Sequence, residues 1–415
     1  MTDELTNGFR KLVSARAQSL MPSDFTRFFS SFFREHETQQ EGFDLSIGNV
    51  CNIPVVQEVL HDALVHVSKN VNRITKYPGT QGYYPLNQKI VELIKKETGV
   101  TYDPEEIVLT NGACDSLYGV FYTFSNPGDY SCYCIPSFPY WSIASKAGVQ
   151  SSLIIYKNPF DYSKTYGDIV AQKISANRKI RTVIINEPHN PIAKNLDKSQ
   201  LYALRDACEE HHVFPVLDEV YRSFSDHWIG DVFDPNSTVM VDSFSKRFGM
   251  PGLRLGFVRM PKRYVPYFRA SLANQVVGIS MVTSLAADYI LEHEKEYALA
   301  ATISREIRER QRKLDSQLRK LDDGVISHVP EGGIYRLLDI SGLDITPSDA
   351  AALLMKQGVK AVSGDKLLIH GIDQMRSPNI LRLSVGGEPR TKEAGQIIVE
   401  TFEKLPRIET LKNTY

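Results

Sequence analysis

Seven short β-rich segments alternate with helical stretches between Glu106 and Met260, and this alternation restricts the possible folds more than any other feature. The segments read EIVLT, YSCYCI, SSLIIY, RTVIIN, FPVLDEV, TVMVDSF and LRLGFVRM. Strands that are apolar on both faces and separated by helices are typical of a mostly parallel sheet that helices cover on each side. We therefore predict an α/β domain, in which ligands bind beyond the carboxyl ends of the strands.

The chain has 415 residues, which is long for a single core, so we expect two domains. Apolar residues at helical spacing predict helices over residues 5–20, 54–70, 85–99 and 292–321. The last of these is charged and leads to a smaller α+β domain built from both chain ends. We expect an N-terminal arm with part of the small domain at 1–53, a large domain at 54–290, and the rest of the small domain at 291–415.

The composition argues against several classes of partner. The formal net charge is −1, so no global charge favours nucleic acid or an anionic membrane. No apolar stretch is long enough to span a bilayer, and the N-terminus lacks the apolar core of a signal peptide. The five cysteines lack metal-ligand spacing, and Cys132 and Cys134 fit the buried face of a strand. We expect a small-molecule ligand, no metal and a reducing cytoplasm.

Polar residues follow several of the predicted strands. Gly112 in TNGACDS opens a helix, whose first amides can bind a phosphate or simply begin the helix. Asn190 in NEPHNPIAK lies in a turn between two prolines, which by itself is a connecting loop. Asp218 lies near the end of the FPVLDEV segment and Tyr221 follows it, at the edge of the sheet, where an acid can also cap the next helix.

The segment SFSKRFGMPGLRLGF, from Ser243 to Phe257, follows another predicted strand. Lys246 and Arg254 within it are either surface cations or part of a reaction site. Lysine is the side chain that forms Schiff bases, because a desolvated amine loses its proton readily. Taken with the other polar residues, the segment indicates a ligand with a phosphate, an electron-poor ring and a carbonyl that condenses with lysine.

These motifs together resemble those of the class I/II aminotransferases, which are fold-type I enzymes that use pyridoxal 5′-phosphate (PLP). Ser-x-Ser-Lys followed by Gly-x-Arg-x-Gly matches at Ser243, Ser245, Lys246, Gly252, Arg254 and Gly256. The segments DEVY and PHNP precede this motif in the order of the family. The similarity extends from about Asp44 to the last helix.

The resemblance implies a catalytic role for three residues. Lys246 would hold PLP as a Schiff base and carry the proton between substrate and cofactor. Asp218 would keep the pyridine nitrogen protonated, because a carboxylate beside a cation favours the charged pair. Tyr221, together with Asn190, would hydrogen-bond the 3′ oxygen of the ring.

The resemblance also implies the remaining contacts. The cofactor phosphate would be held by the amides of Gly112, Ala113 and Cys114, the hydroxyls of Ser243 and Ser245, and Arg254. Phe138 would stack on the ring, and Tyr77 would reach the phosphate in the neighbouring subunit of a homodimer. Arg382 in ILRLSV would clamp the α-carboxylate of the substrate, with Gly48 and Asn190 beside it.

The chain departs from the family pattern next to this site. The usual Asn-Pro-Thr-Gly turn reads Asn190-Pro191-Ile192-Ala193, and alanine costs about 1 kcal/mol where a positive φ is required. We therefore expect the loop to take a different path after Asn190. Glu187 stands where asparagine is common, and Arg336 in GGIYRLL is either a polar contact or exposed.

The predicted activity is amino transfer between an L-amino acid and a 2-oxo acid by a ping-pong mechanism. Another PLP reaction on an amino acid, by a lyase, a cyclase or an oxygen-using enzyme, is the first alternative. A PLP-binding regulator without catalysis is the second.

Overall fold

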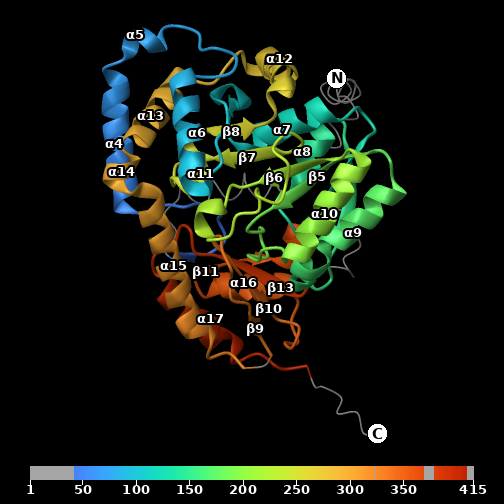
Figure 1. The fold of residues 1–415 in the computed structure, drawn as a ribbon. Helices are drawn as coiled ribbons and strands as arrows, with labels where there is room; N and C mark the ends of the chain where they lie inside the picture. Colours follow the sequence, from blue (N-terminus) through green and yellow to red (C-terminus); the bar gives the residue numbers. More distant parts are fainter. Residues whose placement is uncertain (1–41, 323, 369–377, 409–415) are drawn as a thin grey trace, which may run out of the picture.

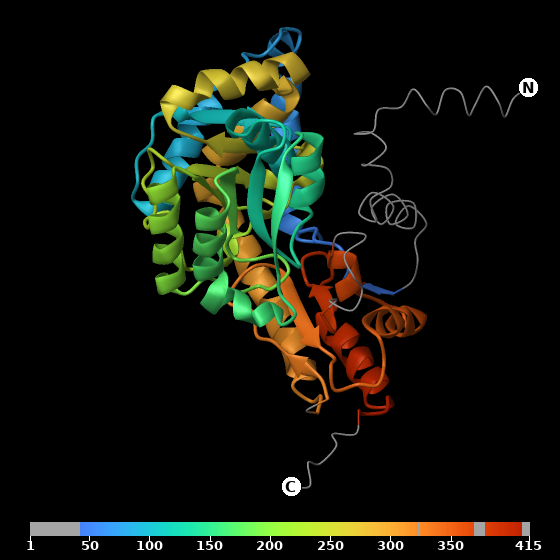
Figure 2. The ribbon, with the colours of Figure 1, turned by 90° about the vertical axis from the view of Figure 1, so that its right-hand side faces the viewer.

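The computed structural model describes residues 42–322, 324–368 and 378–408. The helix predicted over residues 5–20 lies outside these ranges. Figures 1 and 2 show a large helix-covered sheet, and below it a smaller part made mainly of orange and red elements from the end of the chain.

All seven predicted segments form strands of one sheet, in the order β2-β8-β7-β6-β5-β3-β4. β8 runs antiparallel to β2 and β7, and the other pairs are parallel, so the prediction of a mostly parallel sheet is confirmed. The bounds are β2 Ile107–Thr110, β3 Tyr130–Ile135, β4 Gln150–Ile155, β5 Ile180–Asn186, β6 Phe214–Asp218, β7 Val239–Ser243 and β8 Gly256–Arg259.

Helices cover both faces of this sheet because neighbouring strand residues point to opposite sides. Ile184 packs in the core under α7, α8 and α12, whereas Val183 belongs to the larger core on the other face. The helices around the sheet are α7 Ala113–Phe124, α8 Tyr140–Lys146, α9 Tyr162–Ala176, α10 Lys198–His211, α11 Phe244–Arg247 and α12 Val265–Val276.

The helices before the sheet begin and end where their sequences predict. α4 (Pro54–Ser68) starts at its proline, and α6 (Tyr84–Thr98) ends at Gly99, whose φ of 77° suits a glycine. A short helix, α5 (Val71–Ile74), lies between them.

The prediction of one helix over residues 292–321 is wrong. The structure has α13 (Met281–Glu292), α14 (Glu294–Tyr297) and α15 (Leu299–Leu318), with Ala298 in a left-handed conformation at a φ of 45°. The carboxylate of Glu294 accepts a hydrogen bond of 3.1 Å from the Ala300 amide and so satisfies the start of α15.

The smaller part combines segments from both ends of the described chain. β1 (Phe43–Asp44) pairs with β11 (Val359–Lys360), and β10 (Tyr335–Asp339) lies between β9 and β13 (Ile380–Ser384) in an antiparallel sheet. The domain limits at residues 53 and 290 stay a prediction.

The remaining elements are β9 Ile326–Ser327, β12 Val362–Ser363, α16 Pro347–Lys356, α17 Thr391–Phe402, η1 Pro104–Glu106, η2 Pro159–Asp161, η3 Arg222–Phe224, η4 Pro251–Leu253, η5 Lys262–Tyr264 and η6 Gly364–Leu367.

Within the described ranges, no helix combines the length and the apolar character that crossing a bilayer requires.

Candidate active site

Lys246 lies where the large sheet meets the segments of the smaller part. It belongs to α11, directly after β7, and its Nζ donates a hydrogen bond to the carbonyl oxygen of Gly48. Burial is the main cause that lowers the pKa of Lys246 to about 8, and the positive charges of Arg254 and Arg382 contribute to this shift. A lysine in this setting is partly neutral near neutral pH and can act as a nucleophile or a base.

Two ion pairs of the buried Arg247 hold the helix that carries Lys246. Arg247 is 4% exposed, and its guanidinium donates to Asp242 at 3.1 Å and to Glu97 at 2.6 Å. Because Asp242 belongs to β7 and Glu97 to α6, these bonds fix α11 against two neighbouring elements. The position of Lys246 is thus set by residues outside the site.

Asp218, the last residue of β6, is buried beside the site. Its Oδ2 accepts a hydrogen bond of 2.6 Å from the hydroxyl of Tyr140. Burial raises the pKa of Asp218 to about 6, and the Tyr140 hydrogen bond acts in the opposite direction. A cation placed next to this carboxylate would stabilise its charged form.

Asn190 and Tyr221 come together as predicted. The side-chain nitrogen Nδ2 of Asn190 donates to the hydroxyl of Tyr221 at 3.3 Å. Asn186, at the end of β5, supports both loops, because its Oδ1 accepts from the Asn190 backbone and its Nδ2 donates to the Asp218 carbonyl. The hydroxyl of Tyr221 also lies 2.9 Å from that of Tyr335, which the sequence analysis did not single out.

The start of α7 forms a cradle in which two glycines leave no room for side chains. A Cβ on Gly112 would lie 2.5 Å from Nη2 of Arg254, and one on Gly256 would lie 2.6 Å from the Gly112 backbone. Arg254 donates to the carbonyl oxygens of Pro251 and Asn111 and keeps further donors available. Ser243 and Ser245 are both buried at the neighbouring end of β7.

Arg382, on β13, faces the same region. One of its terminal nitrogens donates to the Ser46 carbonyl at 2.7 Å, and its guanidinium lies 4.6 Å from the centre of the Tyr335 ring. Its Nε is buried without a hydrogen-bond partner among the described residues. A buried donor of this kind is available for an anionic ligand.

These observations fit PLP. The cradle at Gly112 suits a phosphate, Asp218 suits a ring nitrogen, and Tyr221 with Asn190 suits a ring oxygen near Lys246. Among the residues that the structure describes, no group of three or more His, Cys, Asp and Glu side chains is arranged to hold a metal ion.

The predicted residues Tyr77 and Phe138 have different surroundings in the single chain. Tyr77 is 89% exposed on the surface, and the ring of Phe138 packs edge to face against Tyr140 at 5.4 Å. The stacking of Phe138 on the cofactor and the reach of Tyr77 into a second subunit stay predictions.

The loop after Asn190 differs from our expectation. Ala193 adopts a φ of 58°, so the alanine does not prevent a left-handed conformation. Two hydrogen bonds hold the backbone of Ala193. Its amide donates to the His189 carbonyl, and its carbonyl accepts from the Glu331 amide. These two bonds compensate for the local strain.

Glu187 lies beneath this loop as a buried acid. Its carboxylate accepts hydrogen bonds from the Leu196 amide and from the hydroxyl of Tyr162. Burial raises the pKa of Glu187 to about 8, so the side chain is mostly protonated at neutral pH.

Arg336 is a core residue and is not exposed. It is 2% exposed and donates to Asp315 at 2.7 Å and to Ser327 at 2.8 Å. Tyr335, its neighbour, points to the other face of β10 and reaches the site. Because side chains alternate along a strand, only one of Tyr335 and Arg336 can face the site. The sequence does not show which face of the strand lies toward Lys246.

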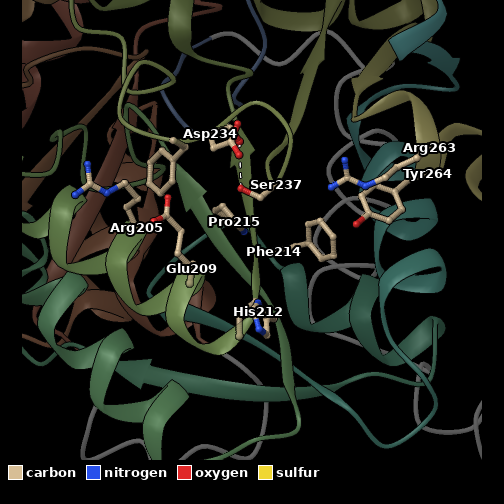
Figure 3. Close-up of a pocket in the computed structure, with 12 residues that line it drawn as sticks. Arg205, Glu209, His212, Phe214, Pro215, Asp234, Ser237, Arg263 and Tyr264 are labelled. Atoms are coloured by element: carbon tan, nitrogen blue, oxygen red, sulfur yellow. Dashed lines mark hydrogen bonds between the residues drawn. The ribbon is translucent and has the colours of Figure 1, made fainter.

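A cavity of about 480 Å³ opens elsewhere, at the amino end of β6 (Figure 3). Phe214, Tyr264 and Arg263 lie on one side of it, and Arg205 and Glu209 lie on the other. Because Asp218 ends β6 at its carboxyl end and Lys246 follows the carboxyl end of β7, this cavity is separate from the candidate site.

Comparison with known proteins gives a consistent picture. The profile of the family "Aminotransferase class I and II" matches residues 41–395. An aspartate aminotransferase of Pyrococcus horikoshii is 26% identical over 288 residues, covering 68% of this chain and 73% of that protein. A probable N-acetyl-LL-diaminopimelate aminotransferase of Bacillus subtilis is 26% identical over 396 residues, covering 93% and 95%.

Solved structures support the fold. The aspartate aminotransferase of Thermus thermophilus with maleate superposes with a TM-score of 0.79 at 22% identity, covering 94% of this chain and 99% of that one. The aspartate aminotransferase of Thermotoga maritima gives the same TM-score and identity, with 94% and 100% covered. Both have the same overall fold as this chain.

Proposed function

Because this chain belongs to the class I and II aminotransferase family, it is a PLP-dependent aminotransferase, and we propose that the residues around Lys246 form its active site. The enzyme moves an amino group between an L-amino acid and a 2-oxo acid. The observation that carries the site assignment is the convergence of a buried lysine, a buried carboxylate, a tyrosine–asparagine pair and a glycine–arginine cradle.

PLP, when bound, supplies an aldehyde that condenses with amines and a ring that accepts electrons from the substrate carbon. In this proposal Nζ of Lys246 would accept the proton from the substrate carbon and would deliver it to the cofactor carbon that takes the amino group. Its lowered pKa supports this role, because an amine that loses its proton near neutral pH serves as a base without a large penalty.

Asp218 and Tyr221 would orient the ring from two sides. The Asp218 carboxylate binds the ring nitrogen, and the positive charge there would lower the pKa of Asp218 below its present value of about 6. Tyr221 and Asn190 bind the ring oxygen. Phe138 would cover one face of the ring.

The phosphate would be held at the start of α7. The amides of Ala113 and Cys114 are the first of that helix and lack intrahelical partners, and Gly112 precedes them. The hydroxyls of Ser243 and Ser245 and the guanidinium of Arg254 complete the set. Arginine suits phosphate because its donors form a planar fork.

Arg382 would bind the α-carboxylate of the substrate, next to Gly48 and Asn190. A guanidinium–carboxylate pair fixes the orientation of the bond that is to be broken. The buried and unpaired Nε of Arg382 supports this role.

The active enzyme is a homodimer in this proposal, with the partner subunit's Tyr77 on the phosphate. Tyr84, Tyr267 and Val277 are exposed as well. The turn at Gly278 packs against Gly79, where a Cβ would lie 2.8 Å from the Gly79 carbonyl oxygen. Exposed apolar residues on adjoining segments are typical of a surface that associates.

A cytoplasmic location also belongs to this proposal. All five cysteines lie in the described ranges and all are free thiols, which suits a reducing compartment.

A half-reaction experiment tests the activity at this site. Purified PLP-loaded enzyme is incubated with single amino acids, while the absorption spectrum, the 2-oxo acid and ammonia are followed. We expect the visible band to disappear with release of one 2-oxo acid per site. Release of ammonia while the band persists would contradict amino transfer.

The role of Lys246 is tested in the same assay. Lys246→Ala should lose the visible band and reduce turnover by about a thousandfold or more. Lys262→Ala is the matched control, because Lys262 is an exposed lysine paired with Asp103. Normal turnover in Lys246→Ala would overturn the assignment.

A further inference from the structure

Tyr335 touches two residues that the proposed function assigns to different tasks. Its hydroxyl lies 2.9 Å from the hydroxyl of Tyr221, and its ring lies beneath the guanidinium of Arg382 at 4.6 Å. Tyr335 is only 3% exposed, so both contacts are made within the protein interior. One side chain therefore joins the residue for the ring oxygen to the residue for the substrate carboxylate.

We propose that Tyr335 is a positioning residue for both groups, an inference that rests on the proposed function. Its hydroxyl directs the proton of Tyr221 toward the cofactor ring, and its ring holds Arg382 in place for the carboxylate. The two tasks belong to different atoms of the same side chain and can be separated experimentally.

The number of hydrogen bonds that Tyr221 can make defines the first task. A tyrosine hydroxyl has one proton and two acceptor positions. The amide nitrogen of Asn190 can only donate, and it takes one of these positions. If Tyr335 donates to the other, the single proton of Tyr221 remains for the ring oxygen.

This arrangement affects the protonation of the bound cofactor. A hydroxyl that accepts a hydrogen bond becomes a better donor, because neighbouring hydrogen bonds polarise one another. Tyr221 would then stabilise a negative charge on the ring oxygen more strongly. Loss of the Tyr335 hydroxyl should raise the pH at which the visible band of the bound cofactor titrates.

The second task depends on the aromatic ring alone. A cation over the face of an aromatic ring is attracted by the negative charge of that face. The guanidinium of Arg382 makes this contact while donating to the Ser46 carbonyl. The ring thus limits the positions that Arg382 can take before a carboxylate arrives.

The backbone of the site is shaped around this tyrosine. A Cβ on Gly48 would lie 2.1 Å from the hydroxyl of Tyr335, so only glycine fits while the hydroxyl stays in place. The carbonyl of the same Gly48 accepts from Lys246. Tyr335 therefore lies against the segment that contacts the lysine.

Two variants separate the tasks. Tyr335→Phe keeps the ring and removes the hydroxyl, and Tyr335→Leu removes both. The control is Tyr166→Phe, because Tyr166 is equally buried and its hydroxyl donates to the Ile184 carbonyl at 2.6 Å instead of to the site. The measurements are a pH titration of the visible band and the KM and kcat for one amino acid.

For Tyr335→Phe we expect the midpoint of the visible band to rise by about half a pH unit or more, with a KM within about twofold of the wild type. For Tyr335→Leu we expect the same rise together with a KM that is about fivefold higher or more. Tyr166→Phe should change neither quantity.

An unchanged midpoint in Tyr335→Phe, where the wild type titrates normally, would overturn the role of the hydroxyl. An unchanged KM in Tyr335→Leu would overturn the role of the ring. Both results would leave the proposed function intact. If the wild type instead forms no visible band with PLP, the proposed function fails and the inference falls with it.

Discussion

The hydroxyl of Tyr140 donates a hydrogen bond of 2.6 Å to Oδ2 of Asp218. Asp218 is buried, and this bond opposes the rise in its pKa that burial causes. The carboxylate that we assign to the ring nitrogen, at the end of β6, is therefore oriented by a residue of helix α8. The hydrogen bond from Tyr140 thus stabilises the ionised form of Asp218, which would pair with the ring nitrogen of the cofactor.

Replacing Tyr140 by phenylalanine should weaken PLP binding. Without the donor, the pKa of Asp218 rises and its carboxylate is less well placed for a cationic ring nitrogen. We expect the Kd for PLP to increase about tenfold, as for the loss of a hydrogen bond to a charged group. Titration of the cofactor-free protein with PLP measures this directly.

Tyr133→Phe is the control for this experiment. Tyr133 packs beside Tyr140 at 5.6 Å, and its hydroxyl pairs with Ser151 instead of Asp218. An equal loss of affinity in both variants would show that the effect comes from packing and not from Asp218.

Glu187→Gln should flatten the dependence of stability on pH. Burial raises the pKa of Glu187 to about 8, whereas an unfolded glutamate has a pKa of about 4.5. Between these values the unfolded state loses the proton and the folded state keeps it, so stability falls as the pH rises from 4.5 through 8. Glutamine cannot ionise, so the Glu187→Gln variant should not show this fall in stability.

The measurement for Glu187 is urea unfolding at several pH values between 5 and 8. The wild type should lose a few kcal/mol more than Glu187→Gln across this range. Glu210→Gln serves as the control, because Glu210 is exposed. Parallel curves for wild type and Glu187→Gln would contradict the raised pKa.

The strands, and the strand ends at which the candidate site residues lie, were predictable because they depend on local patterns. Short apolar segments formed β2 to β8. Asn190, Asp218 and Lys246 lie at or after the carboxyl ends of β5, β6 and β7, which are adjacent in the sheet. The motifs of the family also lie in continuous segments. Local sequence was therefore sufficient to identify these elements.

Tyr335 and Tyr140 were not predictable in the same way. Tyr335 meets Tyr221 across 114 residues of sequence, and Tyr140 meets Asp218 across 78. A buried tyrosine has the same pattern whether it fills a core or supports a site. The break at Ala298 was hidden for a similar reason, since alanine favours helix and only the tertiary context imposes its left-handed φ of 45°.

Ala193→Gly should stabilise the protein. Ala193 holds a φ of 58°, which is costly for a residue with a Cβ and free for glycine. We expect a gain of up to about 1 kcal/mol in the free energy of unfolding, because the larger entropy of glycine in the unfolded chain offsets part of the relief. Denaturant unfolding with an unchanged slope would measure it.

Ala171→Gly is the matched control, because Ala171 lies inside α9. The same substitution there should cost about 1 kcal/mol, through the low helix propensity of glycine. A loss of stability at Ala193 similar to that at Ala171 would show that the turn does not carry the strain that its φ indicates.

Hybrid dimers should show whether Tyr77 works in the neighbouring subunit. Lys246→Ala destroys the site of its own chain, and Tyr77→Phe would damage the site of its partner by removing a phosphate ligand. In a hybrid of the two variants, one site combines an intact Lys246 with the partner's Tyr77, and the other site lacks both. Neither parent dimer contains an intact site.

Random exchange of the two variants makes half of the dimers hybrids, so activity at limiting PLP should return to about a quarter of the wild-type value. The exposed position of Tyr77 allows this arrangement, because its side chain does not pack within its own chain. If Tyr77 instead served its own subunit, every site in the hybrid would lack one of the two residues. Mixing would then restore nothing, even where mass spectrometry shows that hybrids have formed.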